Sequence, residues 1–321
     1  MKKYVSLLLV LTLLSGLFSS CTAGGDKSEG KLRVVTTIFP VYDWCREILG
    51  DRAGKAELTM LLDSGVDLHS YQPTAADMVE ISSCDVFIYV GGESDGWVDD
   101  ALQAAVNPDR IVVNLLESLG DSAKEEEIVE GMEAEEEGEE EGPEYDEHVW
   151  LSLRNAAALT EVIADAISDA NPDHASSYRQ NASAYSEKLN ALDTRYAEAV
   201  AAGSRRTVLF GDRFPFRYLT DDYGLSYYAA FVGCSAETEA SFETIVFLSG
   251  KTDELGLSSI LTIESSDGSI ARTIRDNTAA KDQQILILDS MQSMTAEDVK
   301  NGVTYLSVME TNLAVLAEAL K

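Results

Sequence analysis

Two histidines lie in settings where a side chain could bind a metal ion. His69 stands in the segment Asp-Leu-His-Ser-Tyr-Gln-Pro at residues 67–73, between an apolar run at 57–62 that predicts a strand and a helical pattern that begins at residue 74. His148 stands in Asp-Glu-His-Val-Trp-Leu at 146–151, again immediately before a helical pattern. Open α/β sheets bind ligands at the carboxyl ends of their strands. Because the chain has only three histidines, two in matching positions indicate a metal site.

A carboxylate in the second half of the chain has the same relation to a strand. Asp289 directly follows the apolar run at 284–288, which predicts a strand, so we expect it at a sheet's carboxyl edge. His69, His148 and Asp289 are therefore predicted to face one cleft. Neutral imidazole suits zinc and other transition metals, and a carboxylate accepts zinc and manganese alike.

The elements that must position these side chains alternate between strand and helix patterns. Alternation of this kind predicts an α/β fold with two lobes, each a mostly parallel sheet flanked by helices. We predict a first lobe over residues 32–172 and a second over 204–321. Between them, residues 173–203 predict one long rigid helix, because apolar side chains recur there at steps of three and four. The predicted strands are residues 32–38, 57–62, 85–90, 110–114, 207–210, 226–231, 259–263 and 284–288.

The chain is strongly acidic, with a formal net charge of −32 over 321 residues. This charge excludes nucleic acid and anionic lipid as partners and favours a cation. Thirteen glutamates and one aspartate lie between Glu125 and Glu147, without lysine or arginine. Such a block predicts a disordered loop over residues 121–147, which is either a solubilising insertion or a weak cation-gathering segment next to His148.

The N-terminus has the pattern of an export signal. Lys2 and Lys3 precede an apolar run at 5–18 that is too short to span a bilayer, which predicts a signal peptide over residues 1–20. The following Phe-Ser-Ser-Cys resembles a bacterial lipobox, with phenylalanine where leucine is usual. We therefore predict lipid attachment at Cys21 and a tether over 21–31, with plain secretion as the alternative.

Export permits disulfides, and three cysteines remain after Cys21. The odd number predicts at least one free thiol. Cys45 and Cys84 lie in the same half of the chain, so they are either a disulfide or two buried thiols. The third cysteine is Cys234.

These motifs together resemble the zinc and manganese substrate-binding lipoproteins of bacterial ABC importers, the ZnuA/TroA/PsaA-like family. The resemblance rests on Gly-Val-Asp-Leu-His-Ser-Tyr-Gln-Pro at 65–73, Asp-Glu-His-Val-Trp-Leu at 146–151 and Leu-Asp-Ser at 288–290, and it extends over nearly the whole mature chain. It implies a monomeric protein, anchored by lipid at the extracytoplasmic face of the cell membrane. Such a protein captures a divalent ion, zinc first and manganese next, and presents it to an ABC-type permease without bond chemistry.

The resemblance also implies the ligands His69, His148 and Asp289, but one family ligand is missing. A histidine or glutamate is expected where Phe-Gly-Asp-Arg-Phe-Pro-Phe-Arg-Tyr runs over 210–218, and Arg213 occupies that position. Since arginine cannot bind a cation, we predict Asp212 as the substitute, with Arg213 facing the opposite side and pairing with a carboxylate such as Glu237. Glu237 and Cys234 remain alternative ligands. Another carboxylate would favour manganese, whereas the cysteine would favour zinc.

Three rival functions fit parts of the sequence. Gly-Glu-Ser-Asp-Gly at 92–96 matches the nucleophile elbow of α/β-hydrolases, but no histidine follows His174 to complete a triad. A metal-dependent hydrolase could use the same His, His and Asp set to activate water. A binding protein for a metal chelate or an organic ligand would line its cleft with aromatic side chains and with arginines such as Arg213 and Arg217.

Overall fold

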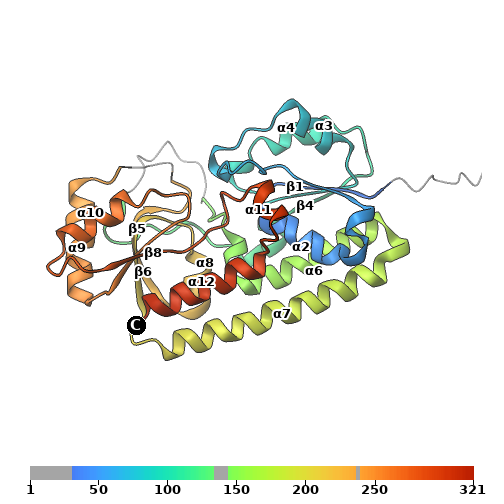
Figure 1. Ribbon diagram of the computed structural model, residues 1–321. Coiled ribbons are helices and arrows are strands. Elements are labelled where there is room, and N and C mark those ends of the chain that lie inside the picture. Colours follow the sequence, from blue (N-terminus) through green and yellow to red (C-terminus); the bar gives the residue numbers. More distant parts are fainter. Residues whose placement is uncertain (1–30, 134–143, 236–238) are drawn as a thin grey trace, which may run out of the picture. The chain divides into compact units, whose positions relative to one another are not determined.

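The computed structural model describes residues 31–133, 144–235 and 239–321 (Figure 1). The predicted signal peptide, Cys21, the centre of the acidic block and Glu237 lie outside these residues. Within the described ranges, no helix is long and apolar enough to cross a membrane.

The first lobe is built on a four-stranded sheet in the order β2-β1-β3-β4, in which all neighbours are parallel. Its strands are short apolar runs, as expected for a sheet that is covered on both faces. Helices α2 and α6 lie on one face and α3 and α4 on the other (Figure 1). The strands are β1 (Arg33–Thr36), β2 (Glu57–Met60), β3 (Val86–Tyr89) and β4 (Ile111–Asn114), and the helices are α2 (Phe39–Leu49), α3 (Ala75–Ser83), α4 (Val98–Gln103), α5 (Leu115–Leu119) and α6 (Leu153–Ala170).

The second lobe repeats this plan with the strand order β6-β5-β7-β8, again with parallel neighbours. Strands β6 and β8 are therefore the opposite edges of this sheet. Helices α9 and α10 cover one face and α12 lies on the other (Figure 1). The elements are β5 (Thr207–Phe214), α8 (Arg217–Tyr223), β6 (Ser226–Val232), α9 (Phe242–Leu255), β7 (Ser259–Thr262), α10 (Ser269–Asn277), β8 (Gln284–Ile287), α11 (Ala296–Lys300) and α12 (Tyr305–Ala319).

One helix contacts both lobes. Helix α7 (Ala175–Ala202) has 28 residues and is therefore about 42 Å long. Its Lys188 pairs with Glu47 of α2, and its Tyr196 hydroxyl donates to the Met309 carbonyl of α12. The predicted fold class, two parallel α/β lobes joined by a long helix, is confirmed.

The core of the first lobe is completed by residues near the other end of the chain. The carboxylate of Asp43, on α2 and only 1% exposed, accepts the backbone N–H of Tyr305 at 2.8 Å. The Tyr305 hydroxyl donates to the Trp150 carbonyl at 2.7 Å, and its ring packs edge-on against Trp44. The first turn of α12 is thus part of the first lobe's interior.

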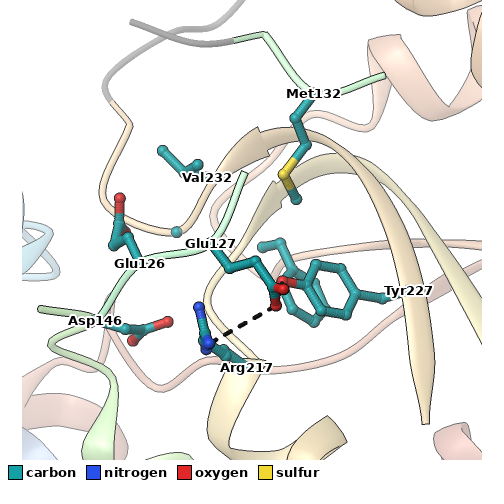
Figure 2. Close-up of a pocket in the computed structure, with 9 residues that line it drawn as sticks. Glu126, Glu127, Met132, Asp146, Arg217, Tyr227 and Val232 are labelled. Atoms are coloured by element: carbon teal, nitrogen blue, oxygen red, sulfur yellow. Dashed lines mark hydrogen bonds and ion pairs between the residues drawn. The ribbon is translucent and has the colours of Figure 1, made fainter. Parts of the chain in front are cut away.

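The prediction that residues 121–147 are disordered throughout is wrong for both ends of that segment. Glu125 and Tyr145 form an antiparallel bridge, and the Glu133 N–H donates to the Ala230 carbonyl on β6. Figure 2 shows Glu127 between Arg217 and Tyr227, and its carboxylate lies 3.7 Å from the guanidinium and accepts the tyrosine hydroxyl at 3.2 Å. The acidic side chains pack because cations and hydroxyls of the second lobe pair with them, which charge counting along the sequence does not reveal.

The open question about Cys45 and Cys84 is answered by the packing. Both are buried free thiols, and no disulfide joins them. Cys234 is also free and is partly exposed.

Candidate metal centre

The two histidines converge from different segments of the first lobe. His69 lies in the short 3-10 turn Leu68–Ser70, whose N-cap Asp67 accepts the His69 backbone N–H at 3.0 Å. His148 immediately precedes a second such turn, Val149–Leu151. Their Nε2 atoms are 3.1 Å apart. The structure therefore brings together the two residues that the sequence singled out first.

Each ring has a polar partner on its other nitrogen. Nδ1 of His148, a fully buried residue, lies 2.9 Å from the Asp146 carboxylate. An ionised carboxylate only accepts, so Nδ1 holds the proton and Nε2 of the neutral ring keeps its lone pair. Nδ1 of His69 lies 2.7 Å from the Ser94 hydroxyl and 3.6 Å from Glu147. The Ser94 hydroxyl can accept a proton from Nδ1 of His69, and in that tautomer both Nε2 lone pairs face the same point, where a cation can bind them.

The separation of the two Nε2 atoms fits one ion. Zinc binds imidazole nitrogen at about 2.0–2.1 Å in tetrahedral geometry, which places two such ligands about 3.3 Å apart. The observed 3.1 Å is close to this value. A modest widening would admit the ion.

A thiol is the third group at this place. Among the described residues, one set of at least three His, Cys, Asp or Glu side chains has its ligand atoms all within 4.8 Å of one another: His69, His148 and Cys234. Cys234 follows β6 in the second lobe, so the set spans the cleft between the lobes. The Cys234 backbone N–H donates to Glu126, one of the packed residues of the acidic segment.

The pKa values in this cluster follow from burial and charge. Burial and the neighbouring His148 lower the pKa of His69 to about 3. Burial opposes ionisation of His148 too, but the Asp146 and Glu147 carboxylates outweigh it and raise its pKa. Burial raises the pKa of Glu147 to about 7 and, together with Glu126, raises the pKa of the Cys234 thiol well above its ordinary value. A metal must therefore displace a proton from the thiol.

The structure does not bring Asp289 to the histidines. Its carboxylate lies beside Glu264, and burial together with Glu264 raises the pKa of Asp289 to about 7. Cys234 and Asp289 each come two residues after an edge strand, β6 and β8, and these strands are three inter-strand spacings or about 14 Å apart. Among the described residues, the Asp289 carboxylate is not one of the ligand atoms grouped around the two histidines, and it accepts the backbone N–H of Met291.

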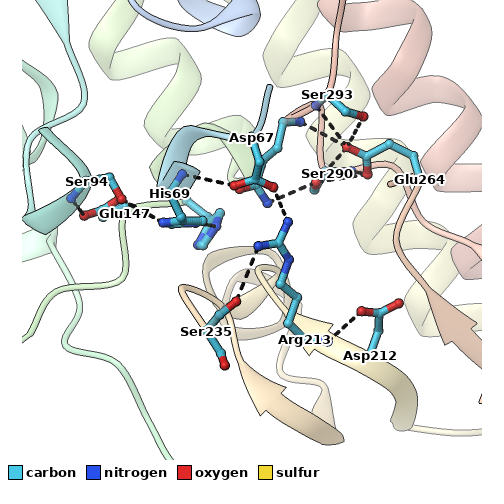
Figure 3. Close-up of polar contacts among 12 residues, drawn as sticks. Asp67, His69, Ser94, Glu147, Asp212, Arg213, Ser235, Glu264, Ser290 and Ser293 are labelled. Carbon is cyan, nitrogen blue, oxygen red and sulfur yellow. Dashed lines mark hydrogen bonds and ion pairs between the residues drawn. The ribbon is translucent and has the colours of Figure 1, made fainter. Parts of the chain in front are cut away.

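Asp212 does not reach the histidines either, which corrects the predicted directions of two neighbouring side chains. Asp212 accepts the Thr262 hydroxyl of β7, whereas Arg213 extends toward the cleft and pairs with Asp67 (Figure 3). The two side chains face opposite sides, as predicted, but it is Arg213 and not Asp212 that faces the cleft. The predicted pairing of Arg213 with Glu237 concerns a residue outside the described ranges.

Gln292 is a candidate ligand that no sequence motif indicated. Its side chain lies close enough to His69 to favour the protonated ring, and its Nε2 donates to the Ser290 hydroxyl. Its Oε1 is buried and accepts no hydrogen bond from the described residues. A buried, unpaired amide oxygen next to the histidines is a natural position for a further ligand.

The surroundings of the cluster disfavour the rival functions. A cavity of about 230 Å³ beside His69 and Cys234 has glutamates as half of its lining residues, which suits a cation better than an organic anion. The Ser94 hydroxyl does contact a histidine, but through Nδ1, while Nε2 faces His148. A hydrolase triad needs the serine on one ring nitrogen and a carboxylate on the other.

Comparison with known proteins identifies the family of this chain. Residues 34–319 match the family model "ZnuA: Zinc-uptake complex component A periplasmic". The chain belongs to the ZnuA family.

Several members of the ZnuA family resemble it over most of its length. The zinc-binding lipoprotein AdcA of Streptococcus pneumoniae is 32% identical over 97% of this chain and 60% of its own, and the high-affinity zinc uptake system protein ZnuA of Bacillus subtilis is 27% identical over 94% and 92%. The chain thus spans about 60% of the length of AdcA. The Zn(II)-bound crystal structure of the ZnuA-like domain of AdcA is 30% identical, covers 91% of this chain and 99% of its own, and superposes with a TM-score of 0.70.

Proposed function

We propose that this protein captures a zinc ion between its two lobes as a transport receptor and not as an enzyme. The ligands are His69 and His148 from the first lobe and Cys234 from the second, with the Gln292 amide oxygen as the fourth. The observation that carries the proposal is the convergence of two imidazole Nε2 atoms and one thiol at one point of the cleft.

The ligand set favours zinc over manganese. Manganese prefers carboxylate and other oxygen ligands, whereas thiolate and imidazole suit zinc. Two carboxylates would have shifted the preference toward manganese, but Asp212 accepts the Thr262 hydroxyl and Asp289 accepts the Met291 N–H. A thiolate also supplies one of the negative charges that a dication needs in a buried site.

Delivery of the ion to an ABC-type permease is the second part of the proposal. The family match and the names of AdcA and the Bacillus subtilis ZnuA, a zinc-binding lipoprotein and a zinc uptake protein, support it. We propose that the protein acts as a monomer at the extracytoplasmic face of the membrane, anchored by lipid at Cys21. The motif at 18–21 supports the anchor.

The proposal is tested by the metal content of the purified protein. Protein prepared without chelator and then dialysed against equimolar zinc, manganese and magnesium should hold about one zinc per chain by mass spectrometry. Added zinc should also raise the unfolding temperature of the metal-free protein, because an ion that binds only the folded state stabilises it. Zinc well below one equivalent, without stabilisation, would refute the proposal.

Gly233 offers a test of the close packing around His148. A Cβ at this position would lie 2.9 Å from the Phe214 carbonyl oxygen and 3.0 Å from His148 Cε1. Gly233→Ala should therefore displace the ring or the Cys234 loop and weaken zinc binding about tenfold, comparable to the loss of a ligand's outer hydrogen bond. The matched control is Gly250→Ala on α9, where an added Cβ meets nothing within 4 Å. Equal affinities by competition titration would contradict the expectation.

A further inference from the structure

Arg213 contacts both loops that present ligands across the cleft. It lies on β5, opposite Phe231 of β6, after a register shift that follows Phe210. The two ends of its guanidinium point to different lobes, toward Asp67 and toward Ser235 (Figure 3). We propose that Arg213 is a positioning residue, a latch that holds the His69 loop and the Cys234 loop together. This inference rests on the proposed zinc site.

On the side of the first lobe, the latch is coupled directly to His69. One carboxylate oxygen of Asp67 accepts the His69 backbone N–H, and the other pairs with Nη2 of Arg213. Any movement of Asp67 therefore moves the N-cap of the turn that presents the imidazole. The ion pair lies partly inside the cleft, with the side chains of Arg213 and Asp67 14% and 17% exposed.

On the side of the second lobe, the latch reaches the residue next to Cys234. Nη1 of Arg213 lies 3.5 Å from the Ser235 carbonyl oxygen. The Arg213 backbone is itself fixed, because its N–H donates to the Asp212 carboxylate, which is held in turn by Thr262. A planar guanidinium presents donors in several fixed directions, so it can serve both lobes at once, and a lysine cannot do so equally well.

The ion pair also explains how an arginine is tolerated beside a dication. Asp67 neutralises the guanidinium, so the metal meets a neutral pair and not an isolated positive charge. Arg213 links the turn that carries His69 directly to the residue after Cys234, in addition to the metal that both segments would bind. Loops that are already held together lose less conformational freedom on binding, so the ion should leave more slowly.

The test separates the ion pair from the N-cap and from charge. Asp67→Asn keeps an N-cap oxygen for the His69 N–H but removes the charge that holds Arg213. Arg213→Met removes the latch, Arg213→Lys keeps only its charge, and the double variant Asp67→Asn with Arg213→Met removes both partners. Arg217→Met is the matched control, since Arg217 is similarly buried and pairs with Glu127 outside this contact.

The readout is the rate of zinc release into excess chromophoric chelator, measured by stopped flow. Asp67→Asn and Arg213→Met should each release zinc about tenfold faster, as expected for a partly buried ion pair, and the double variant no faster than either single one. Arg213→Lys should fall between, and Arg217→Met should match the unaltered protein. A rate of zinc release from Arg213→Met that is equal to or slower than that of the unaltered protein would refute this role of Arg213.

A second readout does not depend on zinc. Hydrogen exchange of residues 67–71 in the metal-free protein should quicken equally in Asp67→Asn, Arg213→Met and the double variant, and not in Arg217→Met. Equal exchange in all variants would overturn the latch even if zinc binds. If the unaltered protein bound no zinc while the variants still showed this pattern of hydrogen exchange, the proposed function would be refuted. The contact between the two loops would still stand.

Discussion

Replacing Cys234 by serine should lower zinc affinity by more than about a hundredfold. The loss of an outer hydrogen-bond partner already costs about 10- to 100-fold, and Cys234→Ser removes a ligand together with the negative charge that it supplies when bound. Serine has nearly the same size, so the loop that follows β6 should keep its position. The protein should remain folded and become a poor zinc receptor.

The same experiment decides between Cys234 and the carboxylates that the sequence favoured. Competition titrations should give Asp212→Asn and Asp289→Asn affinities within a few-fold of the unaltered protein, since Asp212 accepts the Thr262 hydroxyl and Asp289 the Met291 N–H. Cobalt in place of zinc should give a thiolate charge-transfer absorption that disappears in Cys234→Ser. If the cysteine variant kept its affinity and Asp289→Asn lost it, the ligand assignment made here would be wrong.

Zinc affinity should fall steeply as the pH falls. The Cys234 thiol is protonated at neutral pH, because burial and Glu126 raise its pKa well above the ordinary value, so each zinc that binds releases that proton. His148, with its raised pKa, releases a second proton when the pH is below that pKa, whereas His69, with a pKa of about 3, releases none above pH 5. Protons compete with zinc, so affinity should drop about tenfold per pH unit while the thiol alone releases a proton. Below the pKa of His148, where both the thiol and this imidazole release a proton, the affinity should drop about a hundredfold per pH unit.

This dependence is measured by chelator competition from pH 5 to pH 9, with the chelator's own protonation taken into account. In a plot of log affinity against pH, the slope for Cys234→Ser should be smaller by one than the slope for the unaltered protein over the whole range. His174→Gln, which changes the histidine in the turn between α6 and α7, should follow the unaltered protein. A slope unaffected by Cys234→Ser would mean that the thiol is not a ligand.

The fold could be predicted because each of its elements is local. Apolar runs of four to eight residues that alternate with helical periods fix the strands, the helices and their parallel arrangement. His69 and His148 followed from the same local information, since each stands at a recognisable strand-to-helix junction. Helix α8 was not predicted, because residues 210–218 were considered only as a possible ligand motif.

The remaining ligands could not be predicted in the same way, because their positions depend on strand order. The sequence places both Asp289 and Cys234 after strands of the second lobe, but only the order β6-β5-β7-β8 separates their edges. Similarly, alternation along β5 requires that Asp212 and Arg213 face opposite sides but does not say which side meets the cleft. The hydrogen bond from Thr262 and the ion pair with Asp67 decide that.

The insertion of Tyr305 into the first lobe has a consequence for how the protein matures. Asp43, Trp44 and Trp150 obtain their partner from a residue more than 150 positions further along the chain than any of them. The interior of the first lobe is therefore closed only when the last helix, α12, has packed its first turn against it. His69 and His148 belong to that first lobe. We therefore expect the two histidines to be held in place only after residues up to α12 have been synthesised and have folded.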